Sequence, residues 1–140
     1  MPDLADRARA LLDLHTDPEI LVLANVWDVV SARVVAGTEG VRALATASHS
    51  IAATFGYEDG ENIPLDLHLD MVARIAAAVD LPVSMDMEAG YGDPGGTTRR
   101  AIEAGAVGRS SRWAPRWSSC RARWTARRSP FWPRRSVRAG

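Results

Sequence analysis

The chain has 140 residues, 17 basic and 17 acidic side chains and one cysteine, which fit a single soluble domain of ordinary size. One cysteine excludes an internal disulfide framework and a multi-cysteine zinc site, and it favours a reducing, cytoplasmic compartment. The first residues lack a basic segment followed by an apolar core, and no uncharged apolar run approaches about 18 residues, so we expect neither secretion nor a membrane span.

The neutral total conceals two segments of opposite charge. Residues 1–108 contain all 17 acids and seven arginines, a net charge of −10, whereas residues 109–140 contain ten arginines and no acid. The second segment also lacks leucine, isoleucine and methionine, and it contains four of the five tryptophans. We therefore expect a domain boundary after residue 108.

The first predicted elements are a helix, a strand and a second helix. The helix covers residues 3–14, where Asp3 can cap the N-terminus and apolar side chains form one stripe. Residues 20–26 form a continuous apolar run, which is typical of a strand buried on both faces. Asp28 can then cap a helix that extends to about Ala36.

A second unit is predicted to begin with a strand over residues 41–47. A long loop follows, because Gly56, Gly60 and Pro64 interrupt any regular pattern. Apolar residues then recur at helical spacing from Leu65 to Asp80.

The third unit is predicted to open with a strand over residues 83–88. Residues 89–96 are too rich in glycine and proline for a helix or strand, so a loop is expected there. Thr97 or Thr98 then caps a helix that ends at Gly105, and residues 106–108 begin a fourth strand. This alternation of strands and helices predicts an α/β fold built from βα units.

Two acids at the end of the third strand are the sharpest chemical feature. Side chains two apart on a strand point to the same side, so Asp86 and Glu88 are expected to project together at its carboxyl end, where βα folds build active sites. Paired carboxylates suit a hard cation such as Mg²⁺, which keeps several of its waters. The alternative is a solvated acidic strand end that faces Arg99 or Arg100.

Residues 109–140 show neither strand alternation nor helical stripes. Arginine, serine, tryptophan, alanine and proline supply most of the segment, as is typical of a GC-rich coding sequence read in a shifted frame. The alternative is a basic, aromatic arm that binds nucleic acid through phosphate contacts and base stacking. The absence of lysine and of any repeat favours the shifted frame, with a disordered tail.

Several ordered motifs resemble one enzyme superfamily. The segment Pro-Val-Ser-Met-Asp-Met-Glu-Ala-Gly-Tyr-Gly at 82–92, with Asn-Val-Trp-Asp at 25–28, Ala-Thr-Ala-Ser at 45–48 and Gly-Tyr-Glu-Asp-Gly-Glu at 56–61, is similar to isocitrate lyases and phosphoenolpyruvate mutases. The similarity covers residues 12–108 and is strongest to short, phosphonomutase-like bacterial members.

The resemblance implies a (β/α)₈ TIM barrel, of which residues 1–108 would supply the first three to four βα units. It implies a magnesium-dependent lyase or mutase that makes or breaks C–C or P–C bonds beside a carboxylate, through an enolate of a small 2-oxo acid or phosphonate. Intact relatives are expected to form homo-oligomers, and neither a membrane nor a nucleic acid is an expected partner.

The resemblance also implies roles for individual residues. Asp86 would ligate magnesium directly, Glu88 would act through metal-bound water, and Asp59 would lie in the outer shell of the ion. The turn formed by Ala47, Ser48 and His49 would hold the carboxylate and enolate oxygens of the substrate, since oxygens that gain negative charge need fixed donors.

Each assignment has a purely structural alternative. Asp59 can simply solvate an acidic loop, and His49 can be an ordinary hydrogen-bonded loop residue. His15 and His68 are expected at the surface or at its boundary, and Trp27 is expected in the core rather than in the site.

The family pattern ends at Gly108. The segments expected to follow it, an acidic metal-shell residue and a mobile loop with the reaction-specific residues, are replaced by an arginine-rich sequence. We therefore expect this chain to be inactive, with its catalytic residues missing.

Overall fold

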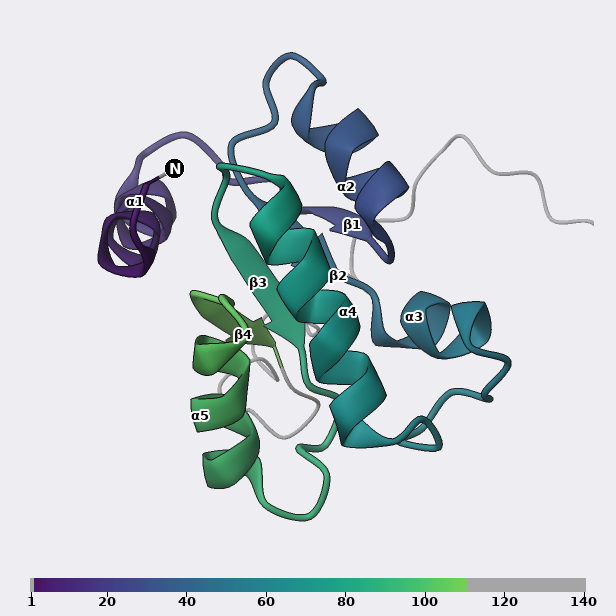
Figure 1. Cartoon of the computed structure of the whole chain (residues 1–140). Coiled ribbons are helices and arrows are strands. Elements are labelled where there is room, and N and C mark those ends of the chain that lie inside the picture. Colours follow the sequence, from purple (N-terminus) through teal and green to yellow (C-terminus); the bar gives the residue numbers. More distant parts are fainter. Residues whose placement is uncertain (1, 111–140) are drawn as a thin grey trace, which may run out of the picture.

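The computed structural model describes residues 2–110, which form a four-stranded parallel sheet flanked by helices (Figure 1). The elements in chain order are α1 (Leu4–Thr16), β1 (Ala24–Val26), α2 (Val29–Ala36), β2 (Leu44–Thr46), α3 (Ser48–Thr54), α4 (Leu65–Ala78), β3 (Val83–Asp86), α5 (Pro94–Glu103) and β4 (Gly108–Ser110). The predictions of a shifted reading frame, a disordered tail and a nucleic-acid-binding arm concern a segment that lies almost wholly outside these residues.

The strands lie in the sheet in chain order, β1-β2-β3-β4, and every neighbouring pair is parallel. In register, Ala24 pairs with Leu44, Leu44 with Val83, and Ser84 with Gly108. All carboxyl ends therefore lie along one edge of the sheet. The start of α4 and the loop before α5 lie at the bottom of Figure 1. The predicted α/β class is confirmed.

Local capping explains where three helices begin. Asp3 caps α1 by accepting from the N–H of Asp6, and Asp28 caps α2 by accepting from the N–H of Ser31. The Ser31 hydroxyl in turn accepts from the N–H of Asp28, which completes a capping box. Asp93 caps α5, whose first residue is Pro94, so that helix begins earlier than Thr97, where the sequence placed its cap.

The apolar core fills the space between one face of the sheet and the helices α2 to α5. One cluster packs α2 and α4 against the first three strands, and it contains Val26, Ala32, Leu44, Ile75, Ala76, Val79 and Val83. The second joins α3, α4 and α5 to the end of β3, and it contains Ile51, Ala52, Ile63, Leu69, Val72, Met85, Met87, Ala101 and Ala106. These clusters anchor the strand ends against helices that begin or end beside them.

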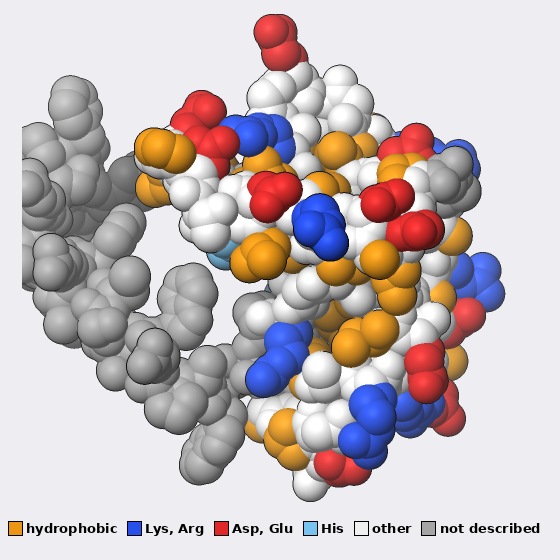
Figure 2. Space-filling model, turned by 90° about the vertical axis from the view of Figure 1, so that its left-hand side faces the viewer, with side chains coloured by type: hydrophobic (Ala, Val, Ile, Leu, Met, Phe, Trp, Pro, Cys, Tyr) orange, Lys and Arg blue, Asp and Glu red, His pale blue; other side chains and the backbone are white. Residues whose placement is uncertain are grey.

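Helix α1 packs on the other face of the sheet, at β3 and β4. A Cβ atom at Gly108 would lie 2.6 Å from the Leu11 side chain and 3.2 Å from the Ser84 Cβ, so a larger residue here would need these neighbours to shift. A cavity of about 250 Å³ remains between α1 and the strands. Its lining does not include Asp86 or Glu88. On the side of the molecule that α1 covers, charged and apolar side chains are interspersed (Figure 2).

Two further sequence-based boundaries differ from the structure. Only residues 24–26 of the apolar run at 20–26 form a strand, and the side chains of Ile20 and Val22 are 85% and 71% exposed. Within residues 2–110, β1 lies at the edge of the sheet and has β2 as its one neighbour. The predicted loop at 48–64 contains α3, which is too short to give a helical repeat in the sequence.

None of the helices in residues 2–110 combines the length and the apolar composition needed to cross a bilayer.

Candidate functional site

Asp86 lies at the point where β2, β3 and α3 meet. Its backbone N–H donates to the Thr46 hydroxyl at the end of β2, at 3.0 Å. Its carboxylate accepts from the Ser48 hydroxyl at 2.8 Å and from the N–H of Glu88 at 3.1 Å. The side chain is half-buried and takes no part in the ion pairs found within residues 2–110, so neutral donors alone orient this carboxylate.

Glu88 is placed by a sharp turn and not by the strand. Because β3 ends at Asp86, the expected strand alternation stops there, and Glu88 has a φ of 50°, in the left-handed region. Its side chain is 1% exposed, and its carboxylate accepts from the N–H of Glu61 at 2.9 Å. The two acids are therefore neighbours that are oriented differently: Asp86 is partly open to solvent and Glu88 is enclosed.

The loop after α3 and the turn after β3 hold each other through paired hydrogen bonds. While the N–H of Glu61 donates to Glu88, the Glu61 carboxylate accepts from the N–H of Tyr91 at 2.7 Å. Glu61, Glu88 and Tyr91 are the non-glycine residues with positive φ in residues 2–110. Such backbone costs on the order of 1–3 kcal/mol per residue and persists where surrounding contacts fix it, as these hydrogen bonds do.

Gly90 permits the turn to close. Its φ is +99°, and an added Cβ would lie 2.9 Å from the Pro94 Cα at the start of α5. The Thr97 hydroxyl then donates to the Gly90 carbonyl at 2.9 Å, which ties the turn to the first residues of α5.

A buried histidine lies beneath this turn. His68 of α4 is fully buried, and its Nδ1 lies 2.9 Å from the Tyr91 hydroxyl. Burial lowers the pKa of His68 below its ordinary value, an effect that the Asp86 carboxylate partly offsets. Burial, followed by the negative charges of Glu88, Glu61 and Asp86, raises the pKa of Tyr91 well above its usual range. Both side chains are therefore neutral near pH 7.

The turn predicted to bind substrate lies at the start of α3. Ala47 is the N-cap residue of this helix and makes no side-chain cap bond, and its N–H donates to the Val26 carbonyl at 2.9 Å. Ser48 is buried and reaches Asp86, as described above. His49 is exposed. The structure thus brings Ser48 and Asp86 together, whereas His49 makes no hydrogen bond that links it to them.

Asp59 lies in the exposed loop after α3, where its backbone carbonyl accepts from the Asn62 amide at 2.8 Å. Within the described part of the chain, no group of three or more His, Cys, Asp or Glu side chains is arranged to hold a metal ion. The assignment of Asp59, Asp86 and Glu88 to a metal site therefore stays a prediction. Arg100 pairs with Asp66, so the alternative in which Arg100 faces the strand-end acids is not what the structure shows.

Sequence reasoning missed His68 and Tyr91. His68 was expected at the surface or its boundary, which is wrong: the apolar stripe of α4 includes position 68, with Leu65 one turn before it and Val72 one turn after it. The helical spacing of His68 from Leu65 and Val72 could therefore have predicted its burial. Glu61 carried no signal, because an acid in an acidic loop is ordinarily solvated. Trp27 is 42% exposed, so it is not a core residue within the described part of the chain.

The lowered pKa of His68 predicts a specific loss of stability in mild acid. Below the ordinary pKa of 6.5, the unfolded chain binds a proton that the folded chain excludes, so the free energy of unfolding should fall as the pH drops below that value. The slope should be at most about 1.4 kcal/mol per pH unit. Urea unfolding of His68→Asn should show a shallower dependence over this range, whereas His49→Asn, at an exposed position, should keep the original slope. Equal slopes in all three chains would contradict the assignment.

The sequence model of the phosphoenolpyruvate phosphomutase family matches residues 11–110. Three solved structures illustrate the similarity. A proposed phosphonomutase from Burkholderia cenocepacia J2315 is 44% identical, with a TM-score of 0.69, over 74% of this chain and 43% of that chain. The phosphoenolpyruvate phosphomutase from Streptomyces platensis subsp. rosaceus is 26% identical, with a TM-score of 0.67, over 73% of this chain and 36% of that one.

A 2,3-dimethylmalate lyase, described as a PEP mutase/isocitrate lyase superfamily member, is 27% identical, with a TM-score of 0.61, over 76% of this chain and 38% of that one. The chain therefore matches less than half the length of each of these relatives. The family match covers most of residues 2–110 and includes every element that builds the site around Asp86. This chain belongs to the phosphoenolpyruvate phosphomutase family, within the isocitrate lyase/PEP mutase superfamily.

Proposed function

We propose that residues 2–110 form the first part of a magnesium-dependent site that stabilises an enolate of a small 2-oxo acid or phosphonate. The observation that carries this proposal is the position of Asp86 at the carboxyl end of β3, half-buried and fixed by Ser48 and by the N–H of Glu88. Active sites of parallel βα folds lie at this edge of the sheet.

The oxygen donors around Asp86 fit magnesium. The carboxylate of Asp86 and the hydroxyl of Ser48 are hard ligands, and magnesium is commonly bound through one or two carboxylates with water completing its shell. Because the Asp86 carboxylate is only half-buried whereas Glu88 is enclosed, we propose Asp86 as the direct protein ligand, the role that the family resemblance implies.

Glu88 and Asp59 would then act at longer range. The Glu88 carboxylate is enclosed and accepts from the N–H of Glu61, which supports a role through water and not direct ligation. Asp59 is exposed in the neighbouring loop and would contribute negative charge to the outer shell. Outer-shell groups orient the direct ligands and tune the ion. Glu88 and Asp59 would therefore affect the affinity for magnesium more than the coordination geometry of the ion.

A bound magnesium ion would supply positive charge where the substrate gains negative charge. The chain's own contribution would be orientation. Within the turn at Ala47, Ser48 and His49, the backbone N–H groups of Ser48 and His49 would face the carboxylate and enolate oxygens, since the N–H of Ala47 already donates to the Val26 carbonyl. The start of α3 has no side-chain cap, which leaves those N–H groups for a ligand. Fixed donors of this kind lower a barrier because they need no rearrangement as charge develops.

The remaining strands and reaction-specific residues of the family would follow residue 110. A (β/α)₈ barrel needs eight strands, and residues 2–110 provide four of them, with β1 and β4 at the edges of the sheet. We therefore propose that the 140-residue chain is an incomplete barrel that binds magnesium weakly and has no turnover with 2-methylisocitrate, oxaloacetate or phosphonopyruvate.

Magnesium binding tests the role of Asp86. Calorimetric titration of the full chain should give a weak but saturable magnesium isotherm, and Asp86→Asn should weaken the affinity by about tenfold or more because the direct ligand loses its charge. Asp80→Asn is the matched control, since Asp80 is exposed before β3, at the opposite end of the strand, and should leave the affinity unchanged. Equal affinities in the two variants would refute the site.

The nucleotide sequence tests the origin of residues 109–140. The family match ends at residue 110, close to the change in composition, which supports a shift of reading frame there. A second frame downstream of codon 108 should restore βα periodicity for well over about 100 residues, beginning with a strand that carries an acid. Resequenced DNA with only stop codons or arginine-rich composition in the other frames would contradict the proposal.

A further inference from the structure

The hydrogen bond between His68 and Tyr91 can form in two ways. Either the Tyr91 hydroxyl donates to Nδ1, or the Nδ1–H group donates to the Tyr91 oxygen, and the 2.9 Å distance fits both. The two rings lie 6.0 Å apart between centroids, so each side chain fixes the position of the other. The choice between the two forms decides where the phenolic proton points.

The other ring nitrogen of His68 favours the second form. Nε2 is buried and has no hydrogen-bond partner within residues 2–110. If Tyr91 donated to Nδ1, the proton of the neutral imidazole would sit on Nε2 as a buried N–H without an acceptor. With the proton on Nδ1, Nε2 carries only a lone pair, and buried N–H groups without partners are the rarer of the two defects in proteins.

The charges around Tyr91 favour the same form. The carboxylates of Glu88, Glu61 and Asp86 are close enough to disfavour the phenolate. When the imidazole N–H donates to the phenol oxygen, the phenol keeps its own proton for a second hydrogen bond, and hydrogen bonds in such a chain strengthen each other cooperatively. In the reverse arrangement, the phenol proton is already donated to His68.

We infer that His68 is a positioning residue which, as its Nδ1–H tautomer, donates to the Tyr91 oxygen and leaves the Tyr91 hydroxyl proton available for a second acceptor. Tyr91 thereby becomes a neutral hydrogen-bond donor, placed on the turn that carries Glu88. Its relevance to magnesium rests on the proposed function, whereas the tautomer and the orientation do not.

Nitrogen NMR of the full chain labelled with ¹⁵N-histidine tests the inference without magnesium. His68 should show a protonated Nδ1 and an unprotonated Nε2 at neutral pH, with the exposed His49 as the internal reference for a mobile imidazole. Tyr91→Phe removes the acceptor and should reduce the Nδ1–H population, whereas Tyr57→Phe should not. A His68 resonance of the Nε2–H form in the unmodified chain would overturn the proposal, even if Tyr91→Phe fails to fold.

A rescue experiment separates positioning from simple packing. In His68→Asn the side-chain amide can donate from nearly the same place as Nδ1, whereas His68→Leu fills space without a donor. The ¹³Cζ resonance of Tyr91, which reports hydrogen bonding at the phenol, should stay close to its original position in His68→Asn and move in His68→Leu. Equal shifts in both variants would contradict a donor role. Because neither readout uses magnesium, failure of the proposed metal site remains distinguishable from failure of this inference.

Discussion

The hydrogen bond from the Ser48 hydroxyl to the Asp86 carboxylate joins the start of α3 to the end of β3, and the geometry of the site depends on it. Thr46 supports the same junction by accepting the Asp86 N–H, so neighbouring strands and the helix between them converge on one carboxylate. Parallel strands make this possible, because their carboxyl ends lie at one edge. A partly open acid held by neutral donors keeps its charge available to a cation.

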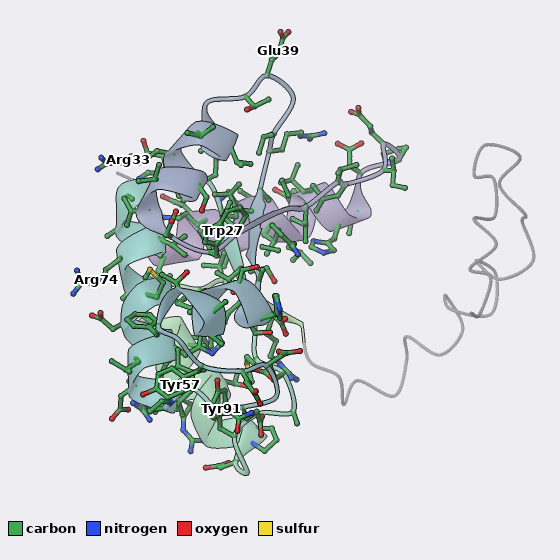
Figure 3. The ribbon with its side chains drawn as sticks, turned by 90° about the vertical axis from the view of Figure 1, so that its right-hand side faces the viewer. Trp27, Arg33, Glu39, Tyr57, Arg74 and Tyr91 are labelled. Carbon is green, nitrogen blue, oxygen red and sulfur yellow. The ribbon has the colours of Figure 1, made fainter. Side chains whose placement is uncertain are left out.

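Backbone amides stabilise the second layer of the site. Glu61 and Glu88 each accept an N–H across the gap between the two loops, and these bonds hold three non-glycine residues in left-handed conformations. Glu39 lies at the opposite end of the molecule from Tyr91 (Figure 3). Among the described residues, the loops at that end are not joined by a comparable pair of carboxylate-to-amide hydrogen bonds. In residues 2–110, non-glycine residues with positive φ thus lie only at the end where the chemistry is proposed, as is common at functional sites.

The sequence predicted the order of strands and most helices, because capping residues such as Asp3 and Asp28 and apolar repeats are local signals. It placed Asp86 at a strand end, which is confirmed. It could not predict that Glu88 leaves the strand, since that conformation depends on a long-range bond to Glu61. The burial of His68 was missed for a different reason: a polar residue within an apolar stripe was assigned to the surface.

Hydrogen exchange at the Glu61 and Tyr91 amides tests most directly whether paired carboxylate bonds fix this site. Both N–H groups should exchange much more slowly than the amide of Glu58, which lies in the same exposed loop region as Glu61. Protection of Tyr91 should fall in Glu61→Gln, because the charged acceptor is replaced by a neutral one. Exchange of the Glu61 and Tyr91 amides at the rate of the Glu58 amide would contradict the account.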